Sequence, residues 1–231
     1  MIIRAEFNKL KPIRYISHLE LMNIFRRTFR RAGLPLAFSR GFNPHIILSP
    51  GYPLKVGMVG RQEYFDLELA EEMDPCVFVE EVNKKFPEGI NILKARTIPP
   101  DIKSLMAVIN TAIYSYKMDF CDESINQQGI IEEFLSKDKI EIIRHRRKKK
   151  DRILDIRPLI YGGWLEESSR WNFKIRCGSS GNVRPTEVLR ALVGRFPAVK
   201  SIPLINIERK GLFVEIKGDF YNPLDDKVIG S

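Results

Sequence analysis

The residues best suited to acid–base chemistry gather in the segment Arg14-Tyr15-Ile16-Ser17-His18, just before a predicted helix. His18 would open that helix, where the positive end of the helix dipole favours a neutral imidazole. A neutral histidine can accept a proton as a general base. Tyr15 is a candidate partner, and His45 would join them if the neighbouring strands flank the helix. The alternative is a purely structural role for His18, which is the commoner one at such positions.

No complete catalytic or metal-binding motif accompanies these residues. HExxH, GxSxG and GxGxxG patterns, paired CxxC motifs and acidic clusters are all absent from the sequence. The cysteines are too widely spaced for a zinc site or a disulfide framework, and the CxxxCxxC pattern of an iron–sulfur site is also missing; they are Cys76, Cys121 and Cys177. We therefore expect no metal, no cofactor and no complete catalytic centre.

The chain is strongly basic, with 38 lysines and arginines against 29 acidic residues and a formal net charge of +9. An excess of this size favours polyanionic partners, nucleic acid first. One concentration of cations lies on the helix predicted after Ser17, on the arc opposite its apolar face. Its members are Arg26, Arg27, Arg30 and Arg31. They indicate either a phosphate-binding surface or a merely solvated helix face.

A second and sharper concentration lies between two predicted strands, at the tip of a hairpin. Such a run is typical of segments that contact a phosphate backbone, and the alternative is a flexible, solvated loop. Phosphate contacts of this kind position a nucleic acid without reading its bases. The run contains Arg144, His145, Arg146, Arg147, Lys148, Lys149, Lys150, Asp151 and Arg152.

A third candidate is the loop Gly178-Ser179-Ser180-Gly181, which precedes a helix predicted to begin at Pro185. Proline suits the first position of a helix, and free amides at a helix N-terminus bind anions. The loop therefore either cradles one phosphate or only connects two elements. It is not a Walker motif, because no Gly-Lys-Ser/Thr follows.

The elements expected to position these residues follow from hydrophobic periodicity. Ser17 and Glu20 form a capping box at the start of the first helix, and Gly33 ends it. In the first part of the chain we predict strands at 1–9, 63–69 and 90–95, extended pieces at 36–40 and 46–49, and helices at 17–32 and 76–86. In the second part we predict strands at 107–120, 171–177 and 202–217, a hairpin at 140–160, and helices at 125–135 and 185–196.

This order predicts an α+β fold made of two ferredoxin-like halves side by side. We expect a first half at 1–98, a linker at 99–105, a second half with the basic hairpin at 106–217, and an irregular tail at 218–231. No stretch approaches the roughly 18 apolar residues of a membrane helix, and no signal peptide is apparent. We therefore expect a cytoplasmic protein that does not contact a membrane.

Several segments resemble the radical SAM-linked proteins, a family defined by a domain of unknown function. The resemblance rests on the blocks at 14–22, 30–36 and 41–45, which include Arg14, Phe42 and Asn43, and on the later stretches at 155–160 and 184–189. In that family the domain is fused to, or encoded beside, a B12-domain radical SAM protein, often near ribonuclease and ribosomal-protein genes. The resemblance thus implies a partner that performs radical chemistry on RNA, and no activity for the domain itself.

Three hypotheses follow from these observations. In the first, the protein is an RNA-binding accessory that presents tRNA or rRNA to a radical SAM partner; the two arginine-rich segments contact phosphates, and Arg14, Tyr15, His18, Phe42, Asn43 and His45 line a recognition or partner cleft. In the second, it is a metal-independent endoribonuclease with His18 as base, by analogy with CRISPR RNA-processing endonucleases. In the third, it is a protein-interaction subunit of a radical SAM enzyme without RNA contact. The missing catalytic motif favours the first.

Overall fold

The computed structural model describes residues 1–121, 124–145, 150–167, 169–179 and 181–230. It is a mixture of antiparallel sheet and helices, which confirms the α+β class. The chain forms two compact units. Unit 1 contains residues 1–110 and 209–231, and unit 2 contains residues 111–208. The predicted division at 99–105 differs from this arrangement, because the C-terminal segment returns to unit 1.

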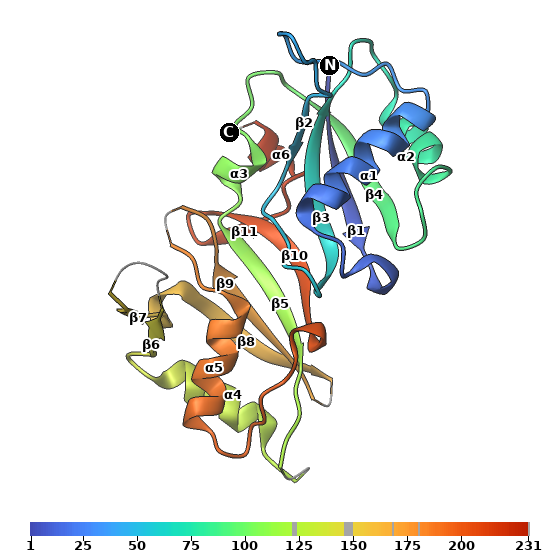
Figure 1. Ribbon diagram of the computed structural model, residues 1–231. Helices are drawn as coiled ribbons and strands as arrows, with labels where there is room; N and C mark the ends of the chain where they lie inside the picture. The colour runs from blue at the N-terminus through green and yellow to red at the C-terminus, as the bar shows by residue number, and fades with distance from the viewer. Residues whose placement is uncertain (122–123, 146–149, 168, 180, 231) are drawn as a thin grey trace. The chain divides into compact units, whose positions relative to one another are not determined.

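Unit 1 is built around the strand order β4-β1-β3-β10, with β2 paired to β3 and β11 paired to β10 (Figure 1). Its strands are β1 (Ile2–Lys9), β2 (Leu48–Pro50), β3 (Val59–Glu68), β4 (Ile90–Ile98), β10 (Ile207–Ile216, in unit 1 from Arg209 onward) and β11 (Asp219–Tyr221). Its helices are α1 (His18–Arg31), α2 (Pro75–Asn83), α3 (Leu105–Val108), α6 (Asp226–Ile229) and the short 3-10 turn at Lys11–Ile13.

The start of α1 has the predicted capping box. The Glu20 amide donates to the Ser17 hydroxyl over 3.2 Å, and the Ser17 amide donates to the Glu20 carboxylate over 2.6 Å. Gly33 follows the helix with a φ of +67°, a left-handed conformation that glycine adopts without strain. These local signals fix both ends of the helix that carries His18 and the first group of arginines.

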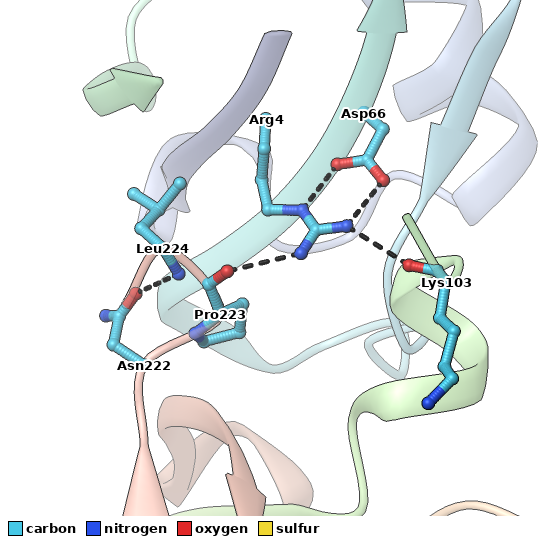
Figure 2. Close-up of polar contacts among 6 residues, drawn as sticks. All are labelled: Arg4, Asp66, Lys103, Asn222, Pro223 and Leu224. Carbon is cyan, nitrogen blue, oxygen red and sulfur yellow. Dashed lines mark hydrogen bonds and ion pairs between the residues drawn. The ribbon is translucent and has the colours of Figure 1, made fainter. Parts of the chain in front are cut away.

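The strand β1 separates an apolar core from a polar layer. Its apolar side chains pack under α1 and α2, where the Phe7 and Phe25 rings lie 4.9 Å apart, centroid to centroid. Its alternate side chains are buried charges. Arg4 donates from Nε and Nη2 to both carboxylate oxygens of Asp66, over 2.8 and 2.9 Å (Figure 2). A charge buried in this way is tolerated because it is paired and hydrogen-bonded.

The C-terminal segment, predicted as an irregular tail, completes this polar layer. Arg4 Nη1 donates to the Pro223 carbonyl over 3.2 Å. The Asn222 amide group donates to the Glu6 carboxylate over 3.2 Å and to the Tyr64 hydroxyl over 2.7 Å. The segment carries little hydrophobic periodicity because polar contacts fix much of it in place.

Unit 2 has the strand order β5-β9-β8 and a separate hairpin of β6 and β7. Its strands are β5 (Thr111–Lys117), β6 (Glu141–Arg144), β7 (Arg152–Asp155), β8 (Ile160–Glu167) and β9 (Arg170–Arg176). Its helices are α4 (Gln127–Ser136), α5 (Pro185–Arg195) and the 3-10 turns at Arg157–Leu159 and Leu204–Asn206. The predicted long strand at 107–120 is shorter, because residues 105–108 form α3 instead.

One face of the β5-β9-β8 sheet packs against α4 and α5. Phe173 of β9 lies 5.9 Å from Phe134 of α4, centroid to centroid, and Tyr116 of β5 donates its hydroxyl to the Pro185 carbonyl at the start of α5. The hairpin β6–β7 and the separate order of strands distinguish unit 2 from a simple repeat of unit 1. Two ferredoxin-like halves are not confirmed.

Candidate nucleic-acid interface

The basic segment begins with an arginine that the protein uses internally. Arg144, at the end of β6, donates from Nε and Nη2 to the two carboxylate oxygens of Glu187 over 2.8 and 2.6 Å. It also donates to the Asn182 carbonyl over 2.8 Å. Glu187 lies in the first turn of α5 and is buried. Arg144 therefore fastens the hairpin to α5, which is a different role from the predicted phosphate contact.

A groove runs between β6 and α5, and we call it the β6–α5 groove. Its volume is about 620 Å³, and its walls include Ile143 and His145 from β6 and the residue after it, and Arg190, Gly194 and Arg195 from α5. Gly194 leaves the groove open, because a Cβ atom added there would meet nothing within 4 Å. An open groove of this size can accommodate an extended polymer on the surface.

The cations of this groove are available to a ligand. Arg190 and Arg195 are exposed, and neither makes an ion pair or hydrogen bond within the described part of the chain. The same holds for Lys150 and Arg152 at the turn end of the β6–β7 hairpin. The buried carboxylate of the groove, Glu187, is already neutralised by Arg144. The exposed Glu141 also lines the groove, so Arg190 and Arg195 outnumber the exposed carboxylates of its wall.

The remaining residues of the basic run fall into two sets, one that the structure describes and one that it does not. His145 approaches Asp151 with 2.8 Å between Nδ1 and a carboxylate oxygen, so this aspartate lies beside the histidine of the run. Four of its predicted phosphate contacts lie outside the described residues; they are Arg146, Arg147, Lys148 and Lys149.

The arginines of α1 form a separate surface in unit 1. Arg27 and Arg30 are exposed and have no partner among the residues that the structure describes. Arg31 donates to the Lys85 carbonyl over 2.6 Å, and Arg26 is half-buried and donates to Asn23 over 3.3 Å. Two of the four predicted contacts thus have no internal role.

The predicted anion loop meets a helix whose N-terminus is partly occupied. The Arg184 amide donates to the Glu187 carboxylate over 2.8 Å, which is the capping contact of α5. Gly178 and Gly181 both have positive φ values, +96° and +153°, so the loop needs glycine there. Ser179 is exposed, and Ser180 lies outside the described residues. The chain's own carboxylate thus satisfies one amide at this helix N-terminus, and phosphate binding by the loop stays a prediction.

His18 lines a small pocket in unit 1 together with Lys9 and Glu63. Its volume of about 20 Å³ is enough for about one water molecule. Burial first, and then the positive charge of Lys9, lower the pKa of His18 below its ordinary value. A neutral imidazole is thus favoured as predicted, but the pocket has no room for a nucleotide.

Buried charges surround this pocket. Lys9 donates from Nζ to the Ile16 carbonyl over 2.9 Å, and burial lowers the pKa of its ammonium group. Burial raises the pKa of Glu63, and the paired Arg209 guanidinium opposes that shift. These groups satisfy one another, which is typical of a structural network.

The other predicted cleft residues do not all meet His18. Arg14 is buried and donates to the Gly57 carbonyl over 2.8 Å, whereas Tyr15 is exposed. His45 lies in the turn closed by the Phe38–Ile46 bridge, and Phe42 and Asn43 are exposed at its tip. The chain from His45 to the pocket at Tyr52 is largely extended and spans roughly 20 Å. The structure therefore separates His18 in its pocket from the turn that carries Phe42, Asn43 and His45.

Metal and membrane features can be stated for the described ranges only. Within them, no group of three or more histidine, cysteine or acidic side chains is arranged to hold a metal ion. No helix in the same ranges is long and apolar enough to span a membrane.

Comparison with known proteins then places the chain. Residues 3–185 match the family described as "Uncharacterized protein conserved in bacteria (DUF2344)". The chain belongs to this family. The DUF2344 match begins at the second residue of β1, includes β2 to β9 and ends at the first residue of α5. Among the curated proteins no match is found.

Among solved structures, this DUF2344 protein is similar to a chain of "Crystal Structure of a Cbf5-Nop10-Gar1 Complex". The TM-score is 0.46 and the sequence identity 11%. The similarity covers 90% of this chain but only 47% of the other, so the chain spans about half the length of that relative.

Sequence reasoning did not identify Arg190 and Arg195 as candidate ligands. They appear as ordinary polar positions of an amphipathic helix, and their significance depends on the hairpin that packs beside them. The sequence carries this signal only for Arg195, which has no acidic residue one turn away on α5. Glu187 lies three residues before Arg190, and only the structure shows that it pairs with Arg144 instead.

Proposed function

We propose that this DUF2344 protein is an RNA-binding accessory protein and that the β6–α5 groove is its principal phosphate-binding surface. The observation that carries the proposal is the pair Arg190 and Arg195. Both arginines line an open groove, and the one buried carboxylate of that groove is already paired with Arg144. A polyanion is the ligand whose charge complements such a wall.

The surrounding sequence supports the same ligand. Lys150 and Arg152 are exposed cations of the hairpin whose strand β6 lines the groove, and the four cations at 146–149 continue the run in the sequence. Together they would let a phosphate backbone follow the groove and continue along the hairpin. Arginine suits this role, because its planar guanidinium can donate two hydrogen bonds to one phosphate.

RNA, and not DNA or another polyanion, is proposed because of the radical SAM-linked resemblance. In that family the neighbouring genes concern ribonucleases and ribosomal proteins. We propose that a radical SAM protein is the partner and that tRNA or rRNA is the shared substrate. Phe42 and Asn43, exposed on the loop between α1 and β2, are candidate contacts for that partner.

The test is binding of tRNA and rRNA fragments to the purified full chain. Replacing both groove arginines, Arg190→Gln with Arg195→Gln, should weaken binding roughly tenfold. The matched control removes two cations that already have carboxylate partners, Lys84→Gln with Lys137→Gln, and should bind like the wild type. Equal affinity in all three proteins would contradict the assignment of the groove.

The partner is tested separately by co-purification with the radical SAM protein. Association that requires RNA and disappears after nuclease treatment supports the accessory role. Association that survives both nuclease and high salt, in a protein that binds no RNA, would favour the protein-interaction subunit instead.

A further inference from the structure

The face of the β5-β9-β8 sheet opposite α4 and α5 carries an exposed tryptophan. Strand alternation assigns each residue to a face, because directly opposed residues in an antiparallel pair share one. Trp164 of β8 is opposite Asn172 of β9, and Asn172 is opposite Ser115 of β5. Their neighbours Leu165, Trp171 and Tyr116 belong to the helix-covered face. Trp164 therefore belongs to the face without helices.

The two tryptophans of the chain have opposite environments. The Trp171 side chain is fully buried and donates from its indole to the Gln127 side chain over 3.0 Å. Trp164 is 38% exposed. Asn172 and Ser115, which share its row across the sheet, are fully buried, so the solvent-exposed part of this row is the Trp164 ring. A large aromatic ring half in solvent is the kind of group on which nucleic-acid bases stack.

Space for a base is available beside the Trp164 ring. The next position of β8 on the same face is Gly162, which is opposite Lys174. A Cβ atom added to Gly162 would meet nothing within 4 Å. Gly163, in contrast, belongs to the packed face, where an added Cβ would clash with the Phe173 ring at 2.7 Å. Only one of these two adjacent glycines is therefore explained by internal packing.

Cations follow the same face along the central strand. Arg170, Lys174 and Arg176 occupy alternate positions of β9. At one end Lys117 of β5 is opposite Arg170, whose Nη1 lies 3.5 Å from the Ser115 hydroxyl.

Two acidic residues, Glu166 and Glu167, are the last residues of β8. The Glu166 carboxylate accepts a hydrogen bond from the Asn172 side-chain amide over 3.3 Å. Glu167 is directly opposite Arg170, whereas Lys174 is opposite Gly162, on the other side of the Trp164 row.

We propose that this face binds single-stranded RNA, with one base stacked on Trp164 over the gap at Gly162 and the flanking phosphates near Lys174 and Arg170. The proposal rests on the proposed function and specifies the RNA as single-stranded at this surface. In a duplex, bases are stacked on one another and cannot leave to cover the ring. Phosphate contacts alone would not distinguish the two forms.

Tryptophan fluorescence tests the stacking directly. Titration of the full-length wild type with a single-stranded oligouridine should quench the emission, because Trp164 is the accessible indole and Trp171 is buried. The quenching should disappear in Trp164→Phe. An RNA duplex of the same length should bind through phosphates with little quenching.

Affinity measurements complete the test. Trp164→Ala should weaken oligouridine binding about tenfold and duplex binding little, whereas Trp164→Phe, which keeps a ring, should lose less. Phe38→Ala removes an exposed ring from unit 1 and serves as the control. Unchanged oligouridine affinity in Trp164→Ala, with binding still weakened in the Arg190 and Arg195 double variant, would overturn the stacking proposal alone. A wild type that binds neither RNA would overturn the proposed function as well.

Discussion

Arg144 and Glu187 form a two-point ion pair that joins the basic hairpin to the first turn of α5. The Nε–Oε1 and Nη2–Oε2 distances are 2.8 and 2.6 Å, and Glu187 is almost completely buried. Because of this pair, the basic residues of the hairpin have two different roles. Arg144 stabilises unit 2, and the exposed cations around the β6–α5 groove remain for a ligand.

Replacement of Arg144 by alanine should lower stability by about 3 kcal/mol, because a buried carboxylate would lose its charged partner. Urea unfolding followed by tryptophan emission measures this loss through Trp171 in the core of unit 2. The matched control is Arg152→Ala, which removes the exposed cation directly opposite Arg144 on β7. That change should alter stability by less than about 0.5 kcal/mol. Similar losses in both variants would show that the ion pair has no special role.

Asn222 should be important for unit 1 despite its place near the C-terminus. Asn222→Ala removes hydrogen bonds to the buried Glu6 carboxylate and the Tyr64 hydroxyl, and one accepted from the Leu224 amide. The expected cost is about 1–3 kcal/mol, measured by denaturant unfolding. Asn91→Ala, at an exposed position of β4, should cost less than about 0.5 kcal/mol. An irregular, unattached tail would give no loss for Asn222→Ala.

His18 should make stability depend on pH in the acidic direction. Its pKa in the folded protein lies below the ordinary value of 6.5. As pH falls through the ordinary value of 6.5, the His18 imidazole of the unfolded chain binds a proton more readily than that of the folded protein. The stability contributed by the neutral imidazole is therefore lost. His18→Gln should therefore lose less stability than the wild type between about pH 7 and pH 5. Parallel pH profiles would show that His18 titrates as in the unfolded chain.

The sequence predicts local features of this fold well and non-local partners poorly. The capping box of Ser17 and Glu20, the stop at Gly33 and the strand at 171–177 are all encoded within a few residues, and the structure confirms them. The ion pair of Arg144 with Glu187 joins residues 43 positions apart. No periodicity indicates which carboxylate an arginine will meet after folding.

The same limit explains why the sequence predicts only part of the candidate site. The basic run was visible as composition, but the groove depends on α5, where Arg190 and Arg195 follow a common helical pattern. The polar segment around Asn222 was predicted as a tail, because buried hydrogen bonds leave no hydrophobic pattern. The separation of His18 from His45 likewise depends on the direction in which β2 runs along β3.

The most direct test of the RNA-binding account is the salt dependence of binding to a single-stranded RNA. Each phosphate contact contributes a slope of roughly −0.7 to the logarithm of affinity against the logarithm of salt concentration. The double variant of Arg190 and Arg195 should therefore have a slope about 1.4 shallower than that of the wild type. The control with Lys84 and Lys137 replaced should keep the wild-type slope. Identical slopes in all three proteins, or no binding by the wild type near physiological salt, would contradict the account.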